Sequence, residues 1–122
     1  MVSLQVIFGI LLIHWFADFV LQTDKQALGK SKEWKWLLNH TINYSLVWLI
    51  VSAFLAGFTS NWYLLLFAPI TFVCHTATDY YTSRVNSQLW EQKKVHQFFV
   101  SIGFDQILHY VQLFLTYYYL TK

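Results

Sequence analysis

Long apolar stretches alternate with polar segments along the chain, and this pattern predicts four helices. The apolar stretches cover about residues 4–21, 37–58, 62–81 and 98–119. Each is close to the roughly 20 residues that an α-helix needs to cross the hydrocarbon core of a bilayer. We therefore expect an all-α fold: a four-helix transmembrane bundle with up-down topology, formed by a single integral membrane domain over residues 1–122.

Two long polar segments, residues 23–36 and 82–97, separate these stretches, and a short turn at residues 57–61 joins the second stretch to the third. Cytoplasmic loops of membrane proteins are enriched in Lys and Arg. All basic residues except Lys122 lie in the two long segments, so we expect both loops in the cytoplasm and both termini outside it, in a bacterial inner membrane. These basic residues are Lys25, Lys30, Lys32, Lys35, Arg84, Lys93 and Lys94.

The composition agrees with a membrane protein. Hydrophobic residues make up 57% of the 122 positions and charged residues only 11%. Soluble domains carry about 25% charged residues, so this chain has too little polar surface to resemble them. The net charge of +2 is small, and no basic stripe or nucleic-acid motif is present, which excludes nucleic acid as an expected partner. The lipid bilayer is the expected environment.

Three His/Asp pairs interrupt the apolar stretches. The members of each pair are four residues apart, so on an α-helix both side chains project from one face. Carboxylates within lipid-length helices are costly to bury and mark functional sites. The pairs are His14 with Asp18, His75 with Asp79, and Asp105 with His109.

The up-down topology brings these pairs to one depth. The polar ends of all four predicted helices meet in the cytoplasmic half of the bundle, where His40 of the second helix joins them. We therefore expect seven ionisable side chains to converge there, with four neutral side chains as hydrogen-bonding partners. The neutral partners are Gln22, Asn39, Asn43 and Gln106.

A divalent metal site is the interpretation that we favour for this cluster. Imidazoles and carboxylates suit Zn above all, and also Mn, Fe or Ni. Seven groups are too many for one tetrahedral ion, so they fit either one metal with Asp residues orienting the His ligands, or two adjacent metals. The expected metal ligands are His14, Asp18, His40, His75, Asp79, Asp105 and His109.

Other interpretations remain open at this point. The His and Asp side chains could simply hold the helices together, although each such bond contributes only about 1 kcal/mol. They could form a proton or ion pathway, since Asp/His chains are used as relays inside membranes and His titrates near neutral pH. Haem ligation by paired His is a further alternative.

The ordered set of motifs resembles a family of small bacterial and phage integral membrane proteins. The resemblance rests on His14-Trp-Phe-Ala-Asp18-Phe-Val-Leu-Gln22-Thr-Asp24, His40, His75-Thr-Ala-Thr-Asp79-Tyr and Asp105-Gln106-Ile-Leu-His109. That family is catalogued as a domain of unknown function, so the resemblance implies a four-helix membrane fold and no established activity. The chain is also loosely similar to inner-membrane proteins described as metal-dependent hydrolases.

These observations favour a membrane metallohydrolase that acts on a lipid-borne or membrane-proximal substrate. In that hypothesis the metal would activate water, and Asp18 or Asp105 would act as general base. A subunit for ion or proton transport is the alternative from another class. A non-catalytic membrane scaffold, within a homo-oligomer, is the third.

Overall fold

The computed structural model describes residues 2–122, and every regular element in that range is a helix. The expected all-α fold is therefore confirmed. The first helix continues directly into a π-helical turn, and a 3₁₀ turn precedes the fourth. The elements are α1 (Leu4–Trp15), the π turn (Phe16–Val20), α2 (Asp24–Gly29), α3 (Trp34–Thr59), the 3₁₀ turn (Trp62–Leu66), α4 (Phe67–Glu91) and α5 (Val95–Thr121).

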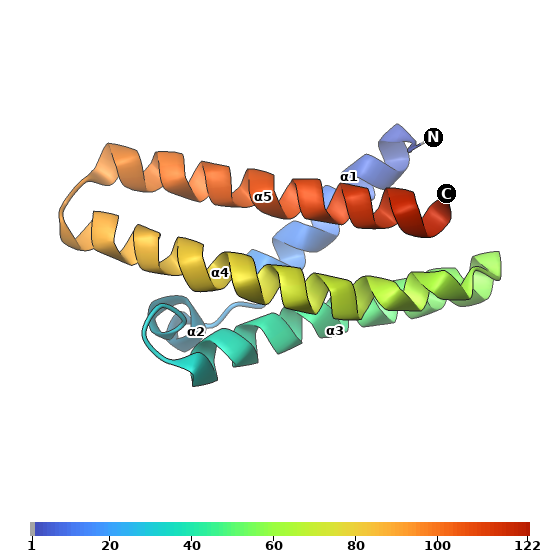
Figure 1. Ribbon diagram of the computed structural model, residues 1–122, viewed down its shortest axis with the longest axis horizontal. Coiled ribbons are helices and arrows are strands. Elements are labelled where there is room, and N and C mark those ends of the chain that lie inside the picture. Colours follow the sequence, from blue (N-terminus) through green and yellow to red (C-terminus); the bar gives the residue numbers. More distant parts are fainter. Residues whose placement is uncertain (1) are drawn as a thin grey trace.

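Three long helices form the body of the protein, as Figure 1 shows. Helix α4 packs between α3 and α5 and runs antiparallel to both. Helix α1 crosses the others at an angle, and the two chain termini lie at the same end of the molecule (Figure 1). The short helix α2 lies beside α3 and α4, away from the termini.

Two helices are long and apolar enough to cross a membrane, namely α3 with 26 residues and α5 with 27. At 1.5 Å per residue each is about 40 Å long, more than the roughly 30 Å of a hydrocarbon core. They correspond to the predicted spans 37–58 and 98–119. Helix α1 is apolar but shorter. The second half of α4 carries Asp79, Arg84 and Glu91.

The prediction of a loop at residues 82–97 is wrong for most of these residues. Helix α4 continues to Glu91 and α5 begins at Val95, so only residues 92–94 connect them. The segment is polar, but it contains no Gly or Pro, and such residues are the usual signals that stop a helix. Its polar side chains bond to neighbouring segments instead: the Ser87 hydroxyl donates to Ser31 at 2.8 Å.

The predicted loop at residues 23–36 also contains a helix, α2. Its start is a capping box, in which the Thr23 hydroxyl accepts from the Gln26 backbone N–H at 3.2 Å. The Gln26 side chain in turn accepts from the Thr23 backbone N–H at 3.0 Å. These reciprocal bonds satisfy N–H groups that a helix start leaves unpaired. The capping box thereby fixes the segment that ends at Lys30.

Gly29 lets α2 pack against the start of α3. A Cβ atom at Gly29 would lie 2.7 Å from Cγ of Trp36. We expect Gly29→Ala to lower the free energy of unfolding by about 1–3 kcal/mol, the usual cost of overpacking. Denaturant unfolding of the purified protein in detergent measures it. Gly103→Ala is the control, because a Cβ there meets nothing within 4 Å. Equal stability of the two variants would contradict the close packing of α2.

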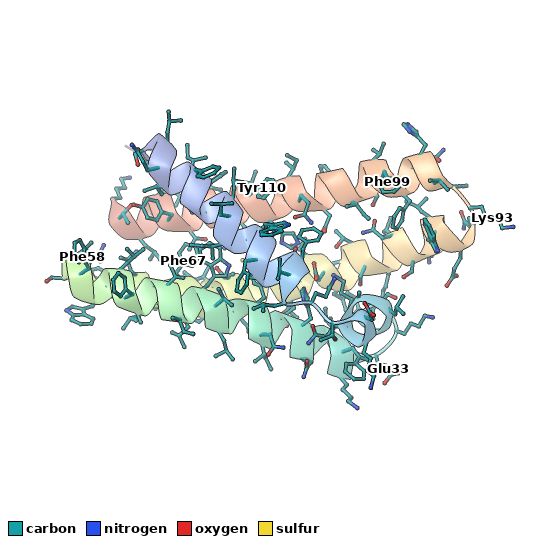
Figure 2. All side chains as sticks on the ribbon, turned by 180° about the vertical axis from the view of Figure 1, so that it is seen from behind. Glu33, Phe58, Phe67, Lys93, Phe99 and Tyr110 are labelled. Carbon is teal, nitrogen blue, oxygen red and sulfur yellow. The ribbon has the colours of Figure 1, made fainter. Side chains whose placement is uncertain are left out.

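The distribution of polar and apolar side chains is inverted relative to a soluble protein. Large apolar side chains such as Phe8, Phe54 and Phe104 are exposed, while polar ones fill much of the interior. Figure 2 shows side chains projecting outward from every long helix. So many large apolar side chains on the exterior are unusual for a protein surface that faces water. The buried polar side chains include His14, Asp18, His40, Thr41, Ser45, Ser52, Thr71, His75, Asp79, Asp105 and His109.

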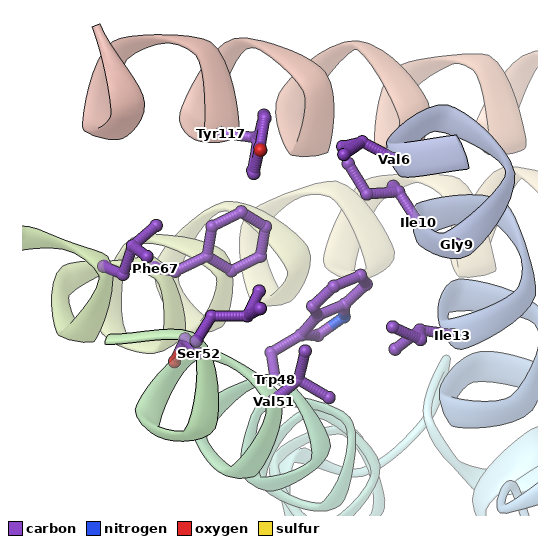
Figure 3. Close-up of a pocket in the computed structure, with 11 residues that line it drawn as sticks. Val6, Gly9, Ile10, Ile13, Trp48, Val51, Ser52, Phe67 and Tyr117 are labelled. Atoms are coloured by element: carbon purple, nitrogen blue, oxygen red, sulfur yellow. The ribbon is translucent and has the colours of Figure 1, made fainter. Parts of the chain in front are cut away.

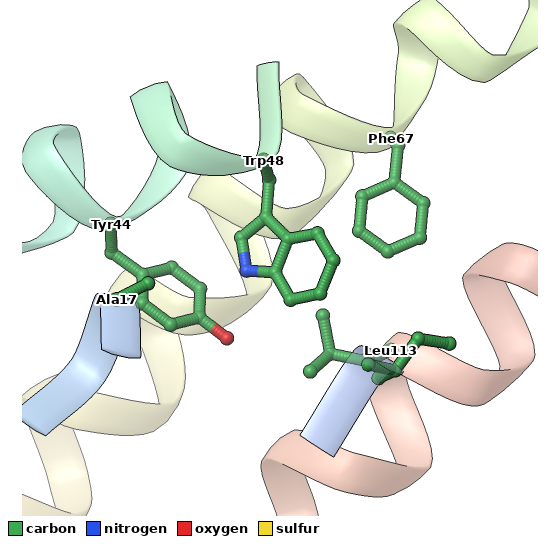
Figure 4. Packing of buried hydrophobic residues seen from close by; sticks show 6 residues of the cluster. Ala17, Tyr44, Trp48, Phe67 and Leu113 are labelled. Carbon is green, nitrogen blue, oxygen red and sulfur yellow. The ribbon is translucent and has the colours of Figure 1, made fainter. Parts of the chain in front are cut away.

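The apolar part of the interior lies toward the end that holds the chain termini. Trp48 of α3 packs against Phe67 at the start of α4, with ring centroids 5.0 Å apart, and Leu113 lies against them (Figure 4). A cavity of about 180 Å³ adjoins this cluster and is also lined by Ile10 and Tyr117 (Figure 3). No His or Asp lines this cavity, so the candidate chemistry lies elsewhere.

Candidate metal centre

Five helical segments contribute side chains to the candidate site. The structure brings together the seven side chains singled out from the sequence, and all seven are buried. The π turn is notable because local π geometry often occurs at functional sites, and it carries one of the carboxylates. The contributions are His14 from α1, Asp18 from the π turn, His40 from α3, His75 and Asp79 from α4, and Asp105 and His109 from α5.

Four of these side chains form a first group, in which one ligand atom of each lies within 4.8 Å of the others: Asp18, His40, His75 and Asp79. The Nε2 atom of His40 lies 2.9 Å from Oδ1 of Asp18 and 3.3 Å from Oδ2 of Asp79. The Nε2 atom of His75 lies 3.2 Å from that of His40. It is also 3.5 Å from Oδ1 of Asp18 and 3.4 Å from Oδ2 of Asp79.

These separations are those of a tetrahedral metal site. Ligand atoms placed about 2.0–2.1 Å from one ion at the corners of a tetrahedron are about 3.3–3.4 Å apart. The five separations measured in the first group run from 2.9 to 3.5 Å and include that value. The donor set of two imidazole nitrogens and two carboxylate oxygens is one that zinc accepts.

Hydrogen bonds alone account poorly for this arrangement. An imidazole nitrogen carries at most one hydrogen, which can point at one acceptor. The Nε2 atom of His40 nevertheless has three close neighbours, one each from Asp18, His75 and Asp79. A cation at the shared point would be bound by all four ligand atoms at once.

A second group shares one residue with the first. The Nε2 atom of His109 lies 3.2 Å from Oδ1 of Asp79 and 3.3 Å from Oδ1 of Asp105. These three side chains also have ligand atoms within 4.8 Å of one another. Asp79 therefore presents Oδ2 to the first group and Oδ1 to the second, as a carboxylate that bridges two cations would.

His14, which was predicted as a ligand, lies outside both groups. Its Nδ1 atom is 2.7 Å from the Tyr44 hydroxyl and its Nε2 atom is 2.6 Å from Oε1 of Gln106. Neutral His14 makes both bonds when the Tyr44 hydroxyl donates to Nδ1 and Nε2–H donates to Gln106. Nε2 is also 3.5 Å from Oδ2 of Asp18. Because the hydrogen on Nε2 points at Gln106, the contact with Asp18 is not a second hydrogen bond.

Lys30 belongs to the site, although the sequence pattern placed it in a cytoplasmic loop. Its Nζ lies 3.0 Å from Oδ2 of Asp79, on the edge of the first group. Burial lowers the pKa of the Lys30 ammonium, but Asp79 and Asp18 outweigh this effect, so the pKa lies above its usual value. The capping box that begins at Thr23 was the available signal, because it predicts the helix that delivers Lys30.

Tyr44 is the second residue that sequence reasoning missed. Its ring stacks on His75 with centroids 3.9 Å apart, while its hydroxyl bonds to His14. Tyr44 is four residues after His40 and so shares its helix face, which was a usable signal.

The neutral side chains predicted as hydrogen-bonding partners of the cluster differ in what they contact. Gln106 contacts His14 and donates to Oδ2 of Asp105 at 3.2 Å, as expected of a partner in the cluster. Asn39 instead accepts a hydrogen bond from Gln26 of α2. The prediction for Asn43 is wrong, because α3 turns His40 and Tyr44 inward and leaves Asn43 exposed.

A comparison with known families places this geometry in context. The family described as "Protein of unknown function (DUF3307)" matches residues 6–122. The chain belongs to this family. The match with the DUF3307 family covers all seven cluster residues, and the description of the family assigns no activity. No curated protein and no solved structure matches the chain. The chemistry of the site must therefore be argued from its own side chains.

Proposed function

We propose that this chain is a four-span membrane protein that binds divalent metal in its His/Asp cluster and acts as a metal-dependent hydrolase on a lipid-borne or membrane-proximal substrate. One observation carries the metal site: four buried ligand atoms from three segments lie within 4.8 Å of one another, and five of their separations, from 2.9 to 3.5 Å, are close to the edge of a coordination tetrahedron. Zinc is the metal proposed first, and Mn, Fe or Ni would accept the same donors.

The two groups of ligands suit different roles. The first group offers four protein ligands, the number typical of a closed site. The second group, Asp79, Asp105 and His109, offers three, and three protein ligands are typical of zinc sites that keep a position for substrate. A bound ion would polarise a substrate oxygen and lower the pKa of water. Two ions bridged by Asp79 would use all the ligands of both groups.

Asp18 and Asp105 are the general-base candidates. Both line a cavity that adjoins the cluster, whereas Asp79 does not. Gln106 also lines that cavity and donates to Oδ2 of Asp105 at 3.2 Å, which holds this carboxylate in place. A carboxylate that reaches the cavity can accept a proton from a water beside the substrate.

Metal analysis of the wild-type protein tests the proposal directly. We expect purification in detergent to yield at least one zinc or other divalent ion per chain, because the ligands are already gathered in the fold. Elemental mass spectrometry measures the metal content, and chelation should lower the melting temperature until metal is restored. Protein free of stoichiometric metal, which does not take it up on addition, would contradict the proposed site.

Lipid-facing surfaces support four spans rather than two. Helix α1 exposes Leu4, Phe8 and Leu12, and α4 exposes Ile70 and Val73, all of which would be costly to leave in water. The ionisable side chains in the middle of these helices, His14 of α1 and His75 and Asp79 of α4, are buried in the bundle, where lipid does not reach them. The basic residues favour cytoplasmic placement of α2 and of the turn between α4 and α5.

Cysteine labelling tests this topology. In a Cys74→Ser background, Thr59→Cys and Gln92→Cys place exposed thiols before and after α4. We expect a membrane-impermeant maleimide to label Thr59→Cys in spheroplasts and Gln92→Cys only after the membrane is opened. Labelling of both thiols from one side would contradict a span at α4, and the reversed pattern would contradict the orientation.

Ion or proton transport is the second candidate, and one contact favours it. The Nδ1 atoms of His75 and His109 lie 3.2 Å apart and link the two groups, so titratable side chains form a connected chain. Flux assays in liposomes separate the candidates. A proton flux that is lost in His14→Ala and Asp18→Asn would favour transport over hydrolysis.

A further inference from the structure

A cavity of about 600 Å³ adjoins the His/Asp cluster. It lies between the π turn with α2 on one side and the hairpin of α4 and α5 on the other. Its lining has a charged part and an apolar part, and few kinds of ligand match both. The polar part includes Asp18, Asp105, Lys30 and Lys32, and the apolar part includes Phe98 and Ile102.

Two buried polar atoms on this cavity lack a partner within the protein. The Ser83 hydroxyl and Oε1 of Gln22 make no hydrogen bond, and the Ser83 side chain belongs to a residue only 6% exposed. Both residues line the cavity. An unpaired buried polar group is unfavourable, so such groups usually have a ligand or water as a partner. They indicate that the polar part of the cavity is built for a hydrogen-bonding head group.

The charge of the site selects the sign of that head group. With neutral imidazoles, the carboxylates of Asp18, Asp79 and Asp105 and the ammonium of Lys30 sum to −2. One divalent ion brings this sum to zero, and a second brings it to +2. Lys32 adds one positive charge on the cavity and Glu91 adds one negative charge, so these two cancel. A cluster that holds two divalent ions therefore attracts an anion, whereas the empty cluster repels it.

The apolar part of the cavity indicates that the anion carries a hydrocarbon chain. Phe98 and Ile102 line the cavity one helical turn apart on α5, and Leu28 of α2 lines it from the other side. Leu28 and Phe99 are exposed and also line the cavity, so its apolar part reaches the protein surface. A chain that entered there from the bilayer would not have to cross water.

We infer that this cavity binds an anionic phospholipid, with its phosphate near Lys30, Lys32 and Ser83 and one acyl chain along Phe98 and Ile102. The inference rests on the proposed metal site and names the substrate class of that site. The ester bonds of a lipid held in this way lie next to Asp18 and Asp105, the two carboxylates that the cavity and the cluster share.

Lipid titration of the full chain in detergent tests the inference, with zinc-loaded protein and tryptophan fluorescence or calorimetry as the readout. We expect phosphatidic acid to bind at least about tenfold more tightly than phosphatidylcholine of the same chain length, because charged hydrogen bonds are the strong ones. Chelation of the zinc should weaken the binding of phosphatidic acid. Equal affinity for the two lipids, or affinity unchanged by chelation, would overturn the inference.

Paired variants locate the binding site. Lys32→Gln should weaken phosphatidic acid binding about threefold to tenfold, while Lys25→Gln, an exposed lysine outside the cavity, should leave it unchanged. Ile102→Trp should fill the apolar part and abolish binding, while Ile107→Trp, on the outer face of α5, should not. Ser83→Ala removes only one hydroxyl and provides a milder variant if Ile102→Trp fails to fold. It should weaken phosphatidic acid binding severalfold.

The failures of the two proposals are distinguishable. Protein that holds metal but binds both lipids alike, or responds equally to each variant and its control, would overturn the lipid site and leave the metal site standing. Protein without metal would overturn the proposed function itself. Inorganic phosphate that binds as tightly as phosphatidic acid would show that the acyl chain contributes nothing, and would also overturn the inference.

Discussion

Asp79→Asn is expected to abolish metal binding and to destabilise the fold more than any other single substitution in the cluster. Asp79 is almost completely buried, and its two oxygens serve both groups of ligands. An amide oxygen is a weak metal ligand, so we expect the affinity for zinc to fall more than about a hundredfold, beyond the effect of losing an outer partner. Competition with a fluorescent zinc chelator measures this change.

The loss of stability has a separate cause. Asp79 neutralises Lys30, whose Nζ lies 3.0 Å away and whose side chain is only 18% exposed. Leaving one charge of a buried pair unpaired costs about 3–5 kcal/mol. Chemical unfolding in detergent measures this cost, and Asp24→Asn, which changes an exposed carboxylate, is the control.

A double variant separates the two effects. Lys30→Met combined with Asp79→Asn removes both charges, so we expect much of the stability to return while metal binding stays absent. If Asp79→Asn retained full metal affinity, the bridging role of this carboxylate would be refuted. If the double variant were no more stable than the single one, the ion pair would not explain the loss.

His75→Ala is expected to remove metal from the first group and to disturb the packing around it. The imidazole is completely buried, supplies one of the four ligand atoms, and stacks on Tyr44. Loss of the ligand should lower zinc affinity at least about a hundredfold, because three remaining donors cannot complete the tetrahedron without water. The cavity left behind should cost about 2–4 kcal/mol in stability.

His96→Ala is the matched control, because His96 is exposed at the start of α5. It should change neither the metal content nor the unfolding midpoint. His75→Gln adds a second test, since it refills part of the space with a polar side chain and should recover stability before metal affinity. Wild-type metal content in His75→Ala would show that the first group is not the metal site.

Lys30 illustrates why part of the site could not be read from the sequence. As a lysine in a basic, polar segment, it looked like the other lysines that favour the cytoplasmic side. Only the docking of α2 against α3, through the contact of Gly29 with Trp36, brings its ammonium to Asp79. The local sequence pattern does not predict such a contact, because the contact depends on where the short helix α2 packs in the folded protein.

His14 illustrates a different limit of the sequence pattern. Its spacing from Asp18 is the same as that of His75 from Asp79, so the spacing alone does not distinguish the two histidines. The tertiary structure separates them: the ring of His14 bonds to Tyr44 and Gln106, while His75 points Nε2 at the first group. The four-residue spacing predicts that a His/Asp pair shares one helix face, but it does not predict which side chains that face contacts.

The residue pattern was enough to predict a helical chain, the positions of its long apolar segments, and the shared helix face of each His/Asp pair. These properties follow from local periodicity, because 3.6 residues per turn fix the direction of each side chain about its own axis. The pattern did not predict which side-chain atoms come into contact, that Asp79 belongs to both groups, or that Lys30 lies beside them. The reason is physical: the rotation and axial register of one helix against another are set by the packing of the whole bundle.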